Sequence, residues 1–229
     1  YLFFGRNWRK ERLFSKKDYA DTQLLATYIQ KYPLTIEDNW QTELSARLNK
    51  LLKNNSKATL TVNNEVKLYS DTMEAFNAIL KGISSAKHFV HMEYFSIFSD
   101  ETGYDMQKIL IQKALEGVEV RFIYDDVGCW MLKKEFKQEL HNAGVEFVPF
   151  MPVWIPFLNS RINYRNHRKL VIVDGKKAYL GGLNIGDKYL GKNSYYGYWR
   201  DSLAEIEGQA VLSLQAIFLA DWNFVTGKN

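Results

Sequence analysis

The sequence predicts an α/β fold in which a mixed, mostly parallel sheet is flanked by helices. Three observations support this prediction. Short runs rich in β-branched and aromatic residues alternate with runs of helical periodicity through the middle of the chain. Glycines and capping residues separate these runs. The chain has 229 residues, 46% of them hydrophobic, which is enough to bury one sizeable core.

Composition limits the classes of function. The net charge is +4, a weaker positive excess than a dedicated nucleic-acid binder carries, so nucleic acid is not the predicted partner. The single cysteine, Cys129, has no partner for an internal disulfide, which favours a reducing compartment. No stretch reaches the roughly 18 apolar residues of a membrane-spanning helix.

We divide the chain into a basic arm over residues 1–34, a connecting helix within residues 35–56 and a globular domain over residues 57–229. The arm opens with the apolar stretch Tyr1–Gly5 and continues with the basic residues Arg6, Arg9, Lys10, Arg12, Lys16 and Lys17. This order is typical of the cytoplasmic exit of a membrane helix, and an ordinary basic arm is the alternative.

The first elements are a helix and a small hairpin. Apolar positions at helical spacing predict a helix from Thr35 to about Lys53. The β-rich run Thr59–Tyr69 is interrupted by Asn63-Asn64, which predicts a hairpin.

The alternation that follows begins with a helix, because Asp71 and Glu74 form a capping-box-like start. This helix ends near Lys87. The next elements are predicted as a strand at Phe89–Phe98, a helix at Tyr104–Glu116, a strand at Val118–Tyr124, a helix at Met131–Asn142 and a strand at Val145–Phe150.

The C-terminal part changes pattern. Two strands, Lys169–Val173 and Ala178–Leu180, are joined by the turn signal Asp174-Gly175. The last elements are predicted as a strand at Leu203–Ile206 and an amphipathic helix at Val211–Val225. No element recurs as a second copy, so the chain reads as one repeat.

The chemistry is predicted from one pattern, HxKxxxxDxxxxxxGGxN, formed by His167, Lys169, Asp174, Gly181, Gly182 and Asn184. His167 and Lys169 are two residues apart, a spacing that places both side chains on one face of a strand. A neutral imidazole attacks phosphorus, and its conjugate acid protonates a leaving alkoxide.

The other members fit a phosphate site. Lys169 supplies a positive charge for the non-bridging oxygens, and Asn184 adds a neutral donor. Gly181 and Gly182 let the backbone approach a ligand closely. Asp174 supports two interpretations, a site residue or a turn aspartate before Gly175.

The pattern resembles the signature of the phospholipase D superfamily, and the wider match resembles bacterial cardiolipin synthases. The matching stretches cover essentially the whole chain and include residues 163–169, 181–187, 189–191, 199–201, 221–222, 117–121 and 124–128. The opening residues 4–9 resemble the stretch that follows two N-terminal membrane helices in that family. The fold implied is a single phospholipase D-like repeat, with residues 57–229 as a catalytic half-domain.

The resemblance implies a double displacement without metal or organic cofactor. A histidine, here His167, attacks one phosphatidylglycerol and releases glycerol, and a second phosphatidylglycerol then takes over the phosphatidyl group to give cardiolipin. Asp201 matches a carboxylate that orients the imidazole in relatives; the alternative is a strand-end salt bridge. The expected location is the cytoplasmic face of a bacterial membrane, with an anionic phospholipid and the membrane surface as partners.

The sequence departs from the family by lacking a second HxKxxxxD, because His88, His91 and His141 have no lysine two residues on. The second motif is therefore expected from a missing C-terminal half or from a homodimer. Two further functions stay open, a homodimeric single-motif nuclease or phosphodiesterase and a catalytically incomplete lipid-binding half.

Three features beside the motif have open interpretations. Arg165 and Arg168 flank His167 and are predicted either to bind a lipid phosphate or to be solvated charges. The proline-aromatic segment Met151–Leu158 either meets the bilayer or packs in the core. Glu93 lies near the end of a predicted strand and is a candidate to approach the cleft.

Overall fold

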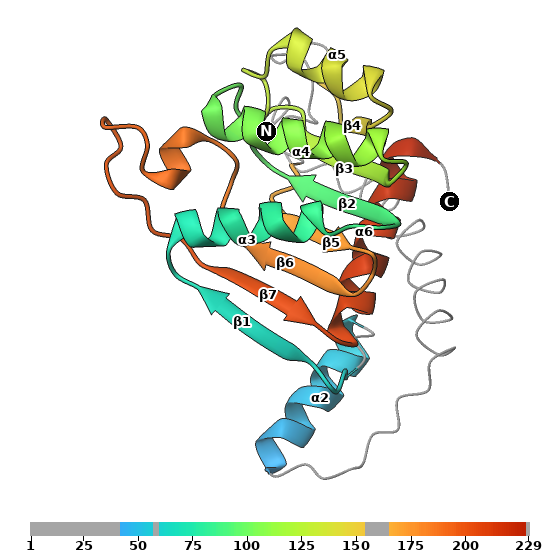
Figure 1. Cartoon of the computed structure of the whole chain (residues 1–229). Helices are drawn as coiled ribbons and strands as arrows, with labels where there is room; N and C mark the ends of the chain where they lie inside the picture. The colour runs from blue at the N-terminus through green and yellow to red at the C-terminus, as the bar shows by residue number, and fades with distance from the viewer. Residues whose placement is uncertain (1–41, 57–59, 154–164, 228–229) are drawn as a thin grey trace, which may run out of the picture.

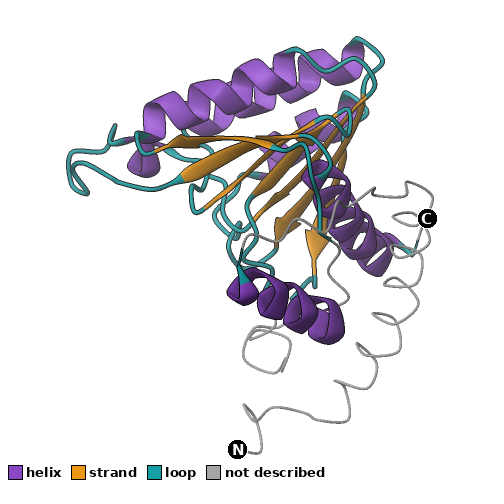
Figure 2. Cartoon of the chain, turned by 90° about the horizontal axis from the view of Figure 1, so that it is seen from below, coloured by secondary structure: helices purple, strands orange, loops and turns teal. Residues whose placement is uncertain are grey.

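The computed structural model describes residues 42–56, 60–153 and 165–227, which form three layers with one sheet in the middle (Figures 1 and 2). The strands run in the order β1-β7-β6-β5-β2-β3-β4. In chain order the elements are α2 (Glu43–Ser56), β1 (Glu65–Tyr69), α3 (Thr72–Ser84), β2 (Phe89–Tyr94), α4 (Glu101–Leu115), β3 (Glu119–Asp125), α5 (Lys134–Asn142), β4 (Glu146–Phe150), β5 (Leu170–Val173), β6 (Lys177–Gly181), the 3₁₀ helix η2 (Asp187–Leu190), β7 (Leu203–Glu207) and α6 (Ala210–Thr226).

One half of the sheet follows the predicted alternation. Strands β2, β3 and β4 pair in parallel, and helices α4 and α5 connect them. The predicted helix start at Asp71 is confirmed, because its carboxylate accepts hydrogen bonds from the backbone N–H groups of Met73 and Glu74. Strand β2 is shorter than predicted and ends at Tyr94, since the chain then leaves the sheet to pack under the loop around Gly128.

The other half of the sheet is antiparallel. The predicted strand pair joined by Asp174-Gly175 is confirmed as β5·β6, whereas the predicted mostly parallel pairing of the sheet was wrong. The pairs β2·β5, β5·β6, β6·β7 and β7·β1 are all antiparallel, so the mixed sheet is not mostly parallel. The hairpin predicted within Thr59–Tyr69 was also wrong for the described residues. Strand β1 pairs instead with β7, a strand that is distant in sequence, and Glu65 lies opposite Glu207.

Each face of the sheet has its own core. Helices α3, α4 and α5 cover the front face in Figure 1, over buried residues such as Met92 and Phe122. Helix α6 crosses the rear face, where Phe218 and Trp222 pack on Ile172. Side chains alternate along a strand, so β2 sends Val90, Met92 and Tyr94 to the front and Phe89, His91 and Glu93 to the rear.

Several predictions fall on residues that the structure does not describe. They are the arm over residues 1–34, the first part of the helix predicted from Thr35 and most of the segment Met151–Leu158. In the described part of the chain, no helix is both long and apolar enough to span a bilayer.

Candidate active site

His167 and Lys169 lie immediately before β5, at the edge of the sheet where β2 ends. Their surroundings differ sharply. Lys169 is 3% exposed, whereas the His167 side chain is exposed to solvent. The Lys169 ammonium donates a hydrogen bond to the His167 carbonyl oxygen at 2.8 Å. A buried cation thus supports the backbone of an exposed imidazole.

Phe95 brings the two side chains together. Its ring centroid is 4.6 Å from that of His167 and 5.1 Å from the Lys169 Nζ. The predicted common face is therefore confirmed, although the regular strand starts one residue later, at Leu170. Phe95 has no place in the sequence pattern, and only its contact with the motif identifies it.

The charge on Lys169 is weakened by its environment. Burial lowers the pKa of Lys169 to about 8, and the negative charges of Asp201 and Asp125 oppose that shift. At neutral pH the side chain still carries most of a full positive charge. In a site with little water this charge acts strongly on a phosphate oxygen.

The two glycines make room for the protein's own chain. A methyl group on Gly182 would lie 2.2 Å from Oδ1 of Asp201, and one on Gly181 would lie 2.3 Å from the carbonyl oxygen of Ser202. In this structure the space at Gly182 lets Asp201 approach closely, and the predicted close approach to a ligand stays a prediction. Any side chain at Gly182 would displace that carboxylate from the neighbourhood of Lys169.

Asn184 and Asp201 complete the set of polar groups. The side-chain oxygen of Asn184 accepts a hydrogen bond from the backbone N–H of Ser96 at 3.2 Å, so its NH₂ group is the end available to an anion. Oδ1 of Asp201 accepts from its neighbour Ser202 at 2.8 Å. Among the described residues, Asp201 forms no salt bridge and no hydrogen bond to the His167 ring. Its predicted role in orienting the imidazole stays a prediction.

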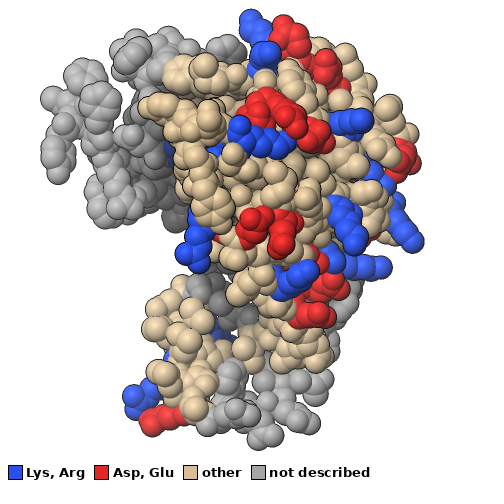
Figure 3. Space-filling model, turned by 60° about the vertical axis from the view of Figure 1, so that its left-hand side comes forward, with Lys and Arg blue, Asp and Glu red and all other residues tan. Residues whose placement is uncertain are grey.

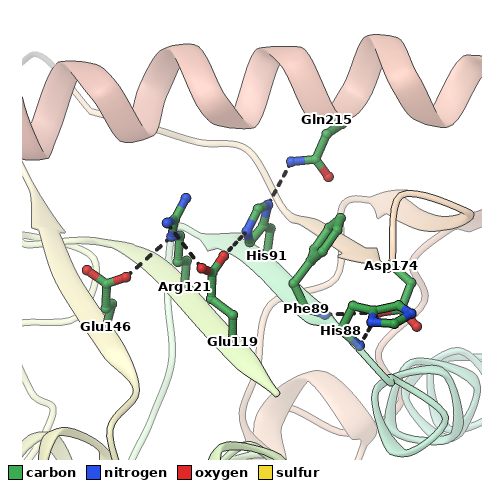
Figure 4. Close-up of polar contacts among 8 residues, drawn as sticks. All are labelled: His88, Phe89, His91, Glu119, Arg121, Glu146, Asp174 and Gln215. Carbon is green, nitrogen blue, oxygen red and sulfur yellow. Dashed lines mark hydrogen bonds and ion pairs between the residues drawn. The ribbon is translucent and has the colours of Figure 1, made fainter. Parts of the chain in front are cut away.

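Asp174 lies at the opposite end of β5 from Lys169. Five residue steps of extended chain at roughly 3.3 Å each separate the two Cα atoms by about 16 Å. The carboxylate accepts hydrogen bonds from the backbone N–H groups of Lys87, His88 and Phe89 at 2.8 to 2.9 Å (Figure 4). Its φ of 53° is a left-handed turn conformation that aspartate tolerates. The geometry therefore supports the turn interpretation of Asp174.

Both arginines beside His167 are engaged by carboxylates. Arg165 contacts Asp125, at 3.5 Å between Nη1 and Oδ1, and Arg168 forms an ion pair with Asp221 of α6. A lipid phosphate would have to compete with these carboxylates. The sequence analysis placed Asp125 and Asp221 in stretches that resemble the family but gave them no role, because their partners come from segments far away along the chain.

No group of three or more histidine, cysteine, aspartate or glutamate side chains suited to a metal ion occurs in the described ranges. The chemistry of the site is that of an imidazole, an ammonium and an amide. The prediction that the reaction needs no cofactor remains untested.

The comparisons with known proteins agree with the motif. The family model described as cardiolipin synthase, PLD-like domain, matches residues 79–222. A cardiolipin synthase of Geobacillus sp. (strain WCH70) is 45% identical over 228 residues, which is 100% of this chain and 45% of that protein. The chain thus spans about half the length of the curated relatives it matches.

Solved structures share the fold. NucT from Helicobacter pylori matches with a TM-score of 0.54 and 18% identity over 70% of this chain and 97% of that one. Phosphatidylserine synthase from Haemophilus influenzae Rd KW20 matches with a TM-score of 0.57 and 16% identity over 76% of this chain and 40% of that one. At these identities the likeness extends to the fold alone.

Proposed function

This chain belongs to the PLD-like domain family of cardiolipin synthases, and we propose that it forms one half of a phosphatidyltransferase that makes cardiolipin from two phosphatidylglycerols. The observation that carries the proposal is the exposed His167 imidazole beside the buried Lys169 ammonium, with Phe95 against both. An exposed neutral imidazole has access to a substrate phosphorus, and a buried cation stabilises the charge that develops there.

The reaction consists of two displacements. In the first, a ring nitrogen of His167 attacks phosphorus, the P–O bond to glycerol breaks, and an acid protonates the departing glycerol oxygen. In the second, a hydroxyl of another phosphatidylglycerol attacks the phosphohistidine, the N–P bond breaks, and the hydroxyl proton passes to the conjugate base of that acid. Lys169 and the Asn184 NH₂ group hold the non-bridging oxygens through both steps, with Gly182 leaving space for Asp201.

The acid must come from a second motif. The sequence contains one HxK pair, and each displacement needs a proton donor or acceptor on the far side of phosphorus from His167. We propose that a second repeat or a second copy of the chain supplies it.

We further propose that the enzyme works at the cytoplasmic face of a bacterial membrane. Two loops beside the site present exposed apolar and aromatic side chains, with Met131 at 83% and Tyr195 at 88% exposure. The first loop contacts Ser96, next to Phe95, and the second leads into Asp201. Figure 3 turns this edge forward, and broad uncharged areas separate its charged side chains. Such side chains suit the interfacial layer of a bilayer.

The decisive experiment separates nucleophile from acid. Bis(p-nitrophenyl) phosphate has a leaving group that departs without protonation, so the chain alone should release a burst of p-nitrophenolate, one equivalent per His167. The adduct should be detectable on His167 by mass spectrometry after alkaline denaturation. No burst and no adduct would contradict the assignment of the nucleophile.

The substrate class is tested in parallel. Phosphatidylglycerol in detergent should yield cardiolipin and glycerol when the second motif is present. Cleavage of DNA without lipid conversion would instead support the single-motif nuclease. Lipid binding with neither reaction would support a catalytically incomplete half.

A further inference from the structure

The segment from Arg165 to Arg168 carries His167 but is not part of a strand. The His167 ring itself has one ring contact, with Phe95, and no hydrogen bond among the described residues. Its position therefore depends on how the neighbouring residues are held. Each of these neighbours is tied to a carboxyl group from a different element.

Asp125, at the end of β3, holds the start of the segment. Its Oδ2 accepts a hydrogen bond from the backbone N–H of Asn166 at 3.0 Å, and its Oδ1 contacts the Arg165 guanidinium. The same carboxylate accepts from the backbone N–H of Gly128 at 2.9 Å. Asp125 thus joins the His167 segment to the loop that packs against Phe95.

Asp221, on α6, holds the end of the segment through its ion pair with Arg168. The backbone N–H of Arg168 in turn donates to the side-chain oxygen of Asn166 at 3.0 Å. Helix α6 therefore reaches the His167 segment from the rear face of the sheet.

Glu93, on β2, lies between these two anchors. It is 0% exposed, and its Oε2 accepts a hydrogen bond from the Asn166 NH₂ group at 3.2 Å. No described residue donates a hydrogen bond to its Oε1. The Glu93 carboxyl is also close enough to Asp221 to feel its negative charge, and a hydrogen bond between two carboxyl groups requires a proton on one of them.

We propose that Asp125, Glu93 and Asp221 are positioning residues that aim His167, and that Glu93 serves as a neutral carboxylic acid donating to the Asp221 carboxylate. Asp221 is the better site for the negative charge, because it is partly exposed and paired with Arg168, whereas Glu93 is fully enclosed.

Charge balance supports this assignment. Among the described residues, the guanidinium groups of Arg165 and Arg168 form salt bridges with Asp125 and Asp221, and no salt bridge reaches Glu93. Burial raises the pKa of Glu93 to about 8; the charge of Asp221 adds to the shift, and Arg168 opposes it. His91, two residues earlier, is the other titratable group on the same face of β2.

The protonation state is tested without any activity assay. The infrared difference spectrum of wild type minus Glu93→Gln, recorded near neutral pH, should contain the carbonyl stretch of a protonated carboxylic acid. Glu135→Gln, which removes an exposed carboxylate of α5, should give carboxylate bands alone. Carboxylate bands alone for Glu93 as well would overturn the neutral-acid assignment.

The positioning role rests on the proposed function of His167, and its readout is the p-nitrophenolate burst. Glu93→Gln keeps the shape and the neutral donor, so it should retain most of the burst rate. Glu93→Leu should slow the burst at least about tenfold with little change in the apparent affinity, because small displacements of a nucleophile are costly. Equal rates in the Gln and Leu variants would overturn this role.

Amide hydrogen exchange tests the positioning role independently of any catalytic activity. The Arg168 amide should exchange at least about tenfold faster in Glu93→Leu than in Glu93→Gln, since the leucine cannot hold Asn166. Asp221→Asn changes the side-chain volume less, and it should also accelerate exchange of the Arg168 amide. Unchanged exchange in both would overturn the positioning role. A wild-type protein without a burst but with these exchange and infrared results would refute the proposed function and leave this inference standing.

Discussion

Strand β5 has His167 and Lys169 before its first residue and Asp174 after its last. At the first end, the imidazole is exposed, and among the described residues its one side-chain contact is with the Phe95 ring. At the other end, the Asp174 carboxylate is occupied by three backbone N–H groups. Both ends belong to one sequence pattern. The polar groups at the first end are still able to bind a ligand, whereas the carboxylate at the other end already forms hydrogen bonds within the fold. Unsatisfied, accessible groups indicate chemistry, and satisfied groups indicate structure.

The largest expected effect concerns the end of β5 that carries His167. Replacing His167 with Ala should abolish the burst, a loss of at least about 10³-fold, because the proposed reaction assigns the attack on phosphorus to this imidazole. Stability should change by no more than about 0.5 kcal/mol, since the ring is exposed. Rate comparison and thermal unfolding check both parts. If the burst survived, the nucleophile would have to be another residue. If the variant were strongly destabilised, His167 would also have a structural role.

The next effect concerns the cation at the same end. Because burial lowers the pKa of Lys169 to about 8, the burst rate should fall about tenfold for each pH unit above that value. Lys169→Arg keeps its charge through this range, so its rate should stay level from pH 8 to 10 even if it is lower throughout. Burst rates of the two proteins at matched pH values give the comparison. A parallel decline in both would mean that another group titrates.

The end of β5 that carries Asp174 should behave in the opposite way, with an effect on stability and little effect on the reaction rate. Asp174→Ala should cost about 2 kcal/mol of unfolding free energy, because three backbone donors lose a charged acceptor. The burst rate of the folded variant should stay within about threefold of wild type, since Asp174 lies about 16 Å from Lys169. Urea unfolding with a parallel rate measurement checks this. A rate loss without destabilisation would restore the catalytic interpretation.

The pH dependence of that stability has a definite sign. Burial alone would raise the pKa of Asp174, but the backbone N–H groups of Phe89, Lys87 and His88 outweigh it, so the pKa is lowered below its ordinary value. The stabilisation is therefore fully present above the unfolded-state pKa and is lost as the pH falls through the folded-state pKa. The difference between wild type and Asp174→Ala should shrink accordingly in acid.

The smallest effect lies midway between the ends, at His91, which faces Ile172 of β5. Its ring stacks between Phe89 and Phe218 and bonds to Gln215 and Glu119 (Figure 4). Burial lowers its pKa to about 4, and Arg121 adds to this against the opposing Glu119.

A histidine that must stay neutral in the folded state destabilises the fold as the pH drops below its unfolded pKa. Wild type should lose about 1 kcal/mol between pH 7.5 and 6 relative to His91→Gln. Urea unfolding at the two pH values measures the difference. If the two proteins lose the same unfolding free energy between these pH values, His91 is not the cause of the loss of stability in acid.

The sequence was informative wherever the signal is local. Helix caps such as Asp71, the periodicity of the helices and the spacing of His167 and Lys169 depend on neighbours along the chain, and the structure agrees with them. The hairpin of β5 and β6 was predicted correctly, but the mostly parallel pairing was wrong for strands distant in sequence, such as β1 and its partner β7, which follows more than 130 residues later. Short apolar runs do not encode which distant run they pair with.

The sequence by itself determined which functional groups the proposed chemistry uses, because an imidazole, an ammonium and an amide are properties of residue types and their spacing. It also determined the alternation that produces an α/β fold. Only the tertiary structure decided what the members of the pattern contact: His167 meets Phe95, Gly182 meets Asp201, and Asp174 turns toward the start of β2. The reason is physical, since exposure, hydrogen-bond satisfaction and charge balance arise when segments distant in sequence bury one another. Glu93 illustrates this, since its carboxyl becomes a buried partner of Asp221 only when α6 closes over β2.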